Sequence, residues 1–169
     1  MKIETLRDLF ETELCYAYDC EQKLVKKGLP TMIEAATSPE LRTALEQHLQ
    51  ETRSHVSRLE RVFSIVGAEA DTESNDVFDK MTSAVKDAID ETKTENLRDA
   101  ALTICGNMVE HYEIALYGTL AAFAQQLGFQ EAAQLLQQTL NEEKAADAKL
   151  TQLGETRVNP SAAQERRAA

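Results

Sequence analysis

The chain is poor in residues that break or bend a polypeptide, with 6 Gly and 3 Pro among 169 residues. A many-stranded sandwich or barrel needs many turn-formers, so this scarcity argues against such folds. Basic residues are also in the minority: 18 Lys and Arg stand against 29 Asp and Glu. The resulting formal charge of −11 argues against electrostatic binding to nucleic acid or to an anionic membrane.

Long apolar runs and paired cysteines are missing as well. No apolar run approaches the roughly 20 residues that a membrane-spanning helix needs. The N-terminus has no signal-peptide core, which predicts a cytoplasmic protein. The cysteines are Cys15, Cys20 and Cys105, without a Cys-x-x-Cys pair. We interpret them mainly as small buried or half-buried side chains, with a redox role as the alternative.

Small polar residues, proline and glycine mark the ends of long helices. Ser38, followed by a proline and an acid, has the pattern of a helix start. Gly67, Gly128 and Gly154 each follow a long apolar-periodic stretch, as glycines at helix C-termini do. The predicted helices cover about 4–36, 39–66, 96–128 and 130–153, with a shorter helix at about 74–92 and a flexible tail at 156–169.

Helix lengths and connections predict an all-α fold. We expect Gly28 and Pro30 to kink the first helix without ending it. Two short connections make two antiparallel hairpins, and the long connection at 67–95 can run the length of a bundle. One long crossover is typical of ferritin-like four-helix bundles. The predicted bundle domain covers residues 1–155.

Each apolar stripe has a carboxylate within it or at its edge, near the middle of its helix. These carboxylates belong to Glu21, Glu51, Glu113 and Glu143. Four unpaired buried charges at one depth would be very unfavourable, whereas two divalent cations would cancel them. A shift of 92 residues maps Glu21 on Glu113 and Glu51 on Glu143, as expected for two related hairpins. The sequence therefore predicts a dinuclear metal site.

Further candidate ligands share these helix faces. His48 and His55 flank Glu51, while Glu110 and Asp147 lie one turn from Glu113 and Glu143. Carboxylates with imidazoles suit iron, with manganese as the alternative. The candidate metal ligands are therefore Glu21, His48, Glu51, His55, Glu110, Glu113, Glu143 and Asp147.

Other side chains near these positions have simpler interpretations. His111 points about 160° away from Glu113, so we interpret it as structural. Tyr18, Tyr112 and Tyr117 are interpreted as core or rim aromatics, with a hydrogen bond or a redox role beside the metal as the alternative.

Three segments, beginning at His48, Glu110 and Glu142, resemble the YciF/YciE-like bacterial stress proteins of the ferritin-like superfamily. They read His-Leu-Gln-Glu-Thr, Glu-His-Tyr-Glu-Ile-Ala-Leu-Tyr-Gly-Thr-Leu and Glu-Glu-Lys-Ala-Ala-Asp. The resemblance covers about residues 3–155 and implies a dimeric, cytosolic, helical protein linked to stress. The chain departs from the usual di-iron pattern because it lacks a forward Glu-x-x-His motif.

Two functions fit these observations. In the first, two iron ions in the bundle core react with a small oxidant, oxygen or peroxide. In the second, the chain is a non-enzymatic stress protein that binds partners, and its metal site is structural or vestigial.

The family resemblance favours a homodimer, for which the crossover offers an apolar face. This face consists of Val77, Phe78, Met81, Val85 and Ile89.

Overall fold

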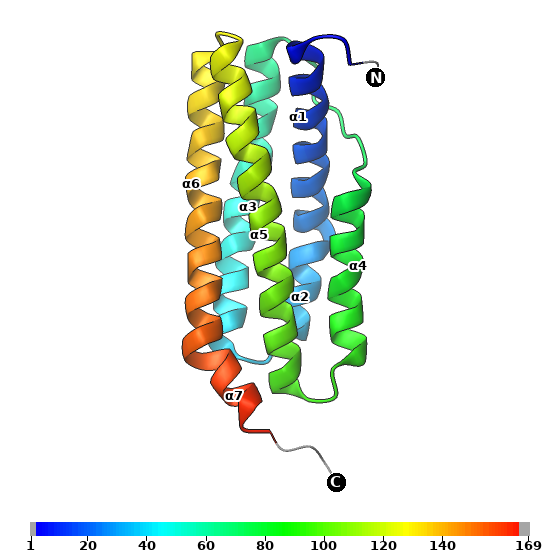
Figure 1. The fold of residues 1–169 in the computed structure, drawn as a ribbon, viewed down its shortest axis with the longest axis vertical. Coiled ribbons are helices and arrows are strands. Elements are labelled where there is room, and N and C mark those ends of the chain that lie inside the picture. The colour runs from blue at the N-terminus through cyan, green and yellow to red at the C-terminus, as the bar shows by residue number, and fades with distance from the viewer. Residues whose placement is uncertain (1–2, 166–169) are drawn as a thin grey trace.

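The computed structural model describes residues 3–165, and every regular element in that range is helical (Figure 1). The four long rods are the α1–α2 pair, α3, α5 and α6, while α4 lies in the crossover between α3 and α5. The predicted all-α bundle with a crossover helix is confirmed. The elements are α1 (Leu6–Lys23), the π-helical turn η1 (Leu24–Gly28), α2 (Leu29–Ala35), α3 (Pro39–Val66), α4 (Asp76–Glu91), α5 (Glu95–Gln126), α6 (Gln130–Leu153), the π-helical turn η2 (Gly154–Val158) and α7 (Asn159–Ala163).

Local chemistry fixes the ends of the central helices. The Ser38 side chain accepts a hydrogen bond from the backbone N–H of Leu41 and so caps α3. Gly67 ends α3 at a φ of 72°, a left-handed conformation that glycine adopts without steric cost. The bounds of α3 and α6 agree with the predicted ranges 39–66 and 130–153.

Both π-helical turns precede a proline. Pro30 and Pro160 each lack a backbone N–H, and each would clash with the carbonyl of the preceding turn in a regular helix. The wider η1 and η2 turns each end two residues before the proline. The helical path therefore continues past each proline, and the expected kink in the first rod takes the form of a π turn.

The described part of the tail that was expected to be flexible is largely helical. Gly154 has a φ of −54°, which is helical, so it does not end the rod. The chain continues through η2 and α7, and Val158 is buried. Apolar contact by Val158 gives this segment a reason to stay helical. Residues 166–169 of the predicted tail lie outside the described residues.

The apolar face of α4 mostly covers the chain's own core. Phe78 and Val85 are buried, and Met81 and Ile89 pack against the same cluster. Val77 is the member of this face that is exposed. The face therefore has little left to offer a second copy, and the homodimer stays a prediction.

The bundle core consists of two apolar clusters. One, near the chain's N-terminus, contains Phe10, Phe63 and Leu120. The other, toward the opposite end of the rods, contains Leu41 and Leu102. Buried polar residues lie between these clusters, halfway along the rods. None of the helices in residues 3–165 has the length and apolarity needed to cross a membrane.

Candidate metal centre

The polar layer between the two apolar clusters contains six carboxylate and imidazole side chains, contributed by all four rods. Each is at most 6% exposed. These residues, named here the buried centre, are Glu21 from α1, His48 and His55 from α3, Glu110 and Glu113 from α5, and Glu143 from α6.

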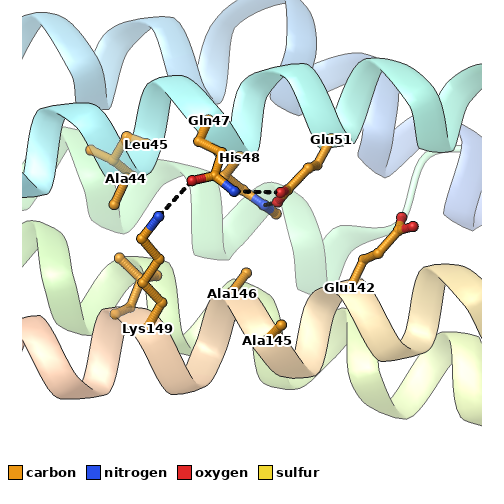
Figure 2. Close-up of a pocket in the computed structure, with 10 residues that line it drawn as sticks. Ala44, Leu45, Gln47, His48, Glu51, Glu142, Ala145, Ala146 and Lys149 are labelled. Carbon is orange, nitrogen blue, oxygen red and sulfur yellow. Dashed lines mark hydrogen bonds and ion pairs between the residues drawn. The ribbon is translucent and has the colours of Figure 1, made fainter.

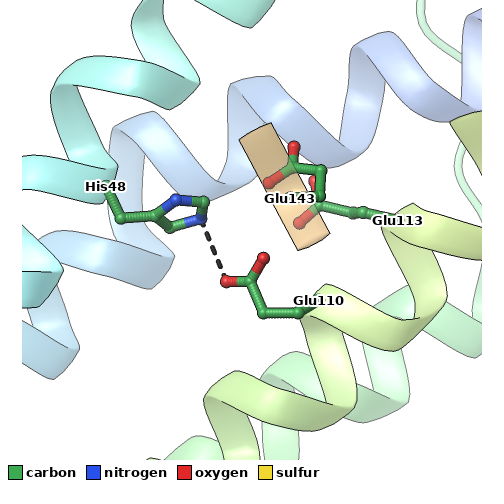
Figure 3. Close-up of side chains that lie close together, drawn as sticks. All are labelled: His48, Glu110, Glu113 and Glu143. Carbon is green, nitrogen blue, oxygen red and sulfur yellow. Dashed lines mark ion pairs between the residues drawn. The ribbon is translucent and has the colours of Figure 1, made fainter. Parts of the chain in front are cut away.

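The buried centre contains two overlapping groups of potential metal ligands. In one group, shown in Figure 3, His48, Glu110, Glu113 and Glu143 offer ligand atoms that lie within 4.8 Å of one another. In the other group, Glu21, His55 and Glu143 do the same. Because Glu143 belongs to both groups, its carboxylate can be shared by two neighbouring cations.

Close contacts hold the centre together around its imidazoles. Nε2 of His48 lies 3.2 Å from Oε1 of Glu110. Nδ1 of His55 lies 3.0 Å from Oε1 of Glu143 and 3.4 Å from Oε1 of Glu21. These pairs bring nitrogen and oxygen atoms from different helices to one place.

Seven buried side-chain atoms of the centre make no hydrogen bond. An unsatisfied buried polar group costs about 1–3 kcal/mol, and more when it is charged. Oxygen and nitrogen atoms without a hydrogen bond are available as ligands of a cation. The atoms are Glu21 Oε2, His48 Nδ1, His55 Nδ1, Glu110 Oε2, Glu113 Oε2, and both carboxylate oxygens of Glu143.

Burial and crowding change the acidities of the centre. Burial, opposed by the His48 charge and aided by Glu143, raises the pKa of Glu110 to about 8. Burial lowers the pKa of His48, but Glu51 and Glu110 outweigh it and bring the value to about 9. Burial also opposes the charge on His55, yet Glu143 and Glu21 raise its pKa to about 11. Without cations, the centre therefore retains protons at neutral pH.

A set of outer contacts orients His55. Its Nε2 lies 2.8 Å from Oε2 of Glu142, leaving Nδ1 directed at the centre. Arg58 in turn donates to Glu142 at 2.9 and 3.2 Å. A carboxylate that binds the second nitrogen of an imidazole is a common way to fix a metal-ligating histidine. Sequence reasoning misses both Glu142 and Arg58, although Glu142 directly precedes Glu143.

Two further side chains contact the carboxylates from within the core. The hydroxyl of Tyr117 donates to Oε1 of Glu21. Sγ of Cys20 donates to Oε1 of Glu113 at 3.5 Å. The hydrogen bond to Glu21 is therefore the role that the structure gives Tyr117, while Cys20 is a buried thiol, as predicted.

The structure leaves two of the eight predicted ligands outside the buried centre. Glu51 has a 36% exposed side chain, accepts a hydrogen bond from Gln47, and lies 3.8 Å from Nδ1 of His48. Asp147 accepts a hydrogen bond from Asn107 at 2.7 Å and lies 3.4 Å from the exposed His111. Each predicted hairpin therefore contributes three side chains to the layer, but Glu51 is not buried as its counterpart Glu143 is.

Comparison with known proteins agrees with this architecture. A family model described as a domain of unknown function, DUF892, matches residues 5–163. Protein YciF of Escherichia coli K12 is 37% identical over 170 residues, covering 96% of this chain and 98% of YciF.

Solved structures match this chain in both fold and sequence. The crystal structure of the E. coli stress protein YciF matches with a TM-score of 0.88 at 36% identity, covering 93% of this chain and 99% of that one. YcfI of Rhodopseudomonas palustris matches with a TM-score of 0.86 at 38% identity, covering 89% and 95%. A Xanthomonas campestris protein at 22% identity, with a TM-score of 0.73, shares the fold. The chain belongs to the DUF892 family, together with the E. coli stress protein YciF.

Proposed function

We propose that the buried centre holds two divalent cations, iron in the first place and manganese as the alternative. The observation that carries this proposal is that six buried carboxylate and imidazole side chains form two overlapping ligand groups and that seven of their oxygen and nitrogen atoms make no hydrogen bond. A core without cations would gain more from apolar side chains at these positions.

The donor set fits two such cations. Four carboxylates supply four negative charges when ionised, which two divalent cations neutralise. Two imidazoles complete a mixed oxygen and nitrogen set that suits iron or manganese better than copper(I). Four carboxylates and two histidines are also the composition of di-iron sites in ferritin-like bundles.

The chemical role we propose is reaction with a small oxidant. Bound iron would supply electrons for the reduction of oxygen or peroxide. The protein's own residues then have separate tasks. Glu142 and Arg58 fix the orientation of His55, Tyr117 holds one oxygen of Glu21, and the two apolar clusters limit water on either side.

The physiological setting we propose is a stress response. The relative YciF is described as a stress protein. Removing iron(II) and an oxidant together would limit damaging chemistry between them, which gives the buried centre a use under such conditions.

Metal titration of the metal-free protein tests this proposal. We expect two manganese(II) ions per chain by calorimetry, and consumption of peroxide after loading with iron(II). Glu113→Gln and Glu143→Gln should each abolish binding of the second ion, whereas His111→Ala, on the exposed surface, should retain both. If both glutamine variants bind manganese like the wild type, the centre is not the metal site, and the non-enzymatic interaction role takes its place.

A further inference from the structure

We propose that the cleft between α3 and α6 is the passage through which divalent cations reach the buried centre. Glu51 would receive the cation at the mouth, and His48 would connect the mouth to the interior. This inference rests on the proposed metal site and adds the route and the residues that control it.

The cleft has walls from α3 and α6, and His48 of the buried centre is one of its lining residues (Figure 2). Its volume is about 140 Å³, room for a few water molecules at about 30 Å³ each. Three other surface hollows, near residues 37–40, 68–73 and 151–159, are lined by none of the six residues of the centre. The lining residues of the cleft are Ala44, Leu45, Gln47, His48, Glu51, Glu142, Ala145, Ala146, Lys149 and Leu150.

Small side chains on α6 keep the cleft open. Ala145 is exposed at the surface and Ala146 is buried deeper in the wall. Each offers a single methyl group where a larger side chain would fill the space between the helices. The width of the passage therefore depends on these two positions.

Ligand atoms follow one another from the surface inward. Glu51 and Glu142 line the cleft from opposite helices, with side chains 36% and 31% exposed. Nδ1 of His48 is buried, makes no hydrogen bond, and lies 3.8 Å from Oε2 of Glu51. The other nitrogen of the ring lies 3.2 Å from Glu110. The His48 ring thus faces the cleft carboxylate on one side and the buried centre on the other.

A polar chain spans the cleft beside this route. Nζ of Lys149 on α6 donates to Gln47 on α3 at 2.6 Å, and Gln47 donates to Glu51 at 2.8 Å (Figure 2). This chain restrains Glu51 and places a positive charge near the mouth. Both effects oppose the arrival of a cation, so Lys149 would slow it.

Stopped-flow mixing of the metal-free protein with cobalt(II), followed by visible absorption, tests the route without requiring turnover. Ala145→Leu and Ala146→Leu should slow association by about tenfold or more while changing Kd less than about threefold, because dissociation uses the same passage. Lys149→Ala should accelerate association, most strongly at low salt. Ala148→Leu, an exposed alanine on the same helix outside the cleft lining, is the matched control and should match the wild type.

The outcomes separate the two proposals. If wild-type protein binds no cobalt(II) at equilibrium, the metal site fails and the passage with it. If wild-type protein binds cobalt(II) but Ala145→Leu associates at the wild-type rate, the passage alone is refuted. Because Ala145 is exposed, its variant decides the matter even if Ala146→Leu fails to fold.

Discussion

Replacing Glu110 by glutamine should stabilise the metal-free protein while impairing the metal site. The pKa of this carboxyl is raised from 4.5 to about 8, mainly by burial. Between these values the folded state keeps a proton that the unfolded state has lost. Folding stability from this group therefore falls as pH rises through the window from 4.5 to about 8.

The magnitude follows from the same values. At pH 7, protonating a group of ordinary pKa 4.5 costs about 3 kcal/mol at 1.36 kcal/mol per pH unit. Glutamine has a similar shape and no charge, so it avoids this cost. Losing the attraction between His48 and Glu110 offsets part of the gain, leaving about 1.5–3 kcal/mol. This corresponds to a rise in Tm of about 3–10 °C for a chain of this size.

Urea denaturation in the presence of a chelator, repeated from pH 4.5 to pH 8, measures this effect. The advantage of Glu110→Gln should be near zero at the acidic end and grow with pH. Excess manganese(II) should then stabilise the wild type by about 3 kcal/mol at one hundred times Kd, and the variant much less. Glu46→Gln, an exposed change on α3, serves as the control. A destabilised Glu110→Gln, or a gain independent of pH, would refute the reasoning.

Two further predictions concern proton release and a buried helix connection. The pKa of His48 is about 9 and that of Glu110 is about 8, so both groups carry protons at pH 7. Metal binding at pH 7 should therefore release about two or more protons, and the affinity should increase as pH rises. Calorimetric binding heats that do not depend on the buffer's ionisation enthalpy would contradict this. Asp99 is buried and accepts hydrogen bonds from the backbone N–H groups of Thr37 and Ser38 at 2.8 and 2.7 Å, which ties the connection between α2 and α3 to α5. Asp99→Ala should therefore lower the free energy of unfolding, measured in urea, by about 2–4 kcal/mol. A loss below about 0.5 kcal/mol would contradict this role of Asp99.

Periodicity predicted most of the fold because each long helix carries strong local signals. Ser38 and Gly67 mark the two ends of α3 by mechanisms that act within one turn, so its bounds could be predicted from sequence. The end of the last rod could not be predicted in the same way. Pro160 signals a break, but a π turn and the burial of Val158 keep the path helical. Those effects depend on packing against other helices.

The depth of the centre was easier to predict than the side-chain directions within it. Glu51 is only one position from the buried Thr52, and such an edge residue can lie inside or at the rim. Packing of α3 against α6 places it at the rim of the cleft. The contact of Glu142 with His55 joins residues 87 positions apart, so no local pattern could reveal it.

The polar layer between the two apolar clusters also aligns the helices along the bundle axis. Sliding one rod by a single turn would move its side chains by about 5.4 Å. For α5, that shift would carry Glu110 or Glu113 out of the layer and toward leucines of a neighbouring cluster. A purely leucine-lined interior would tolerate such sliding far better. The buried ionisable residues therefore favour one alignment of the helices along the bundle axis, with or without a bound cation.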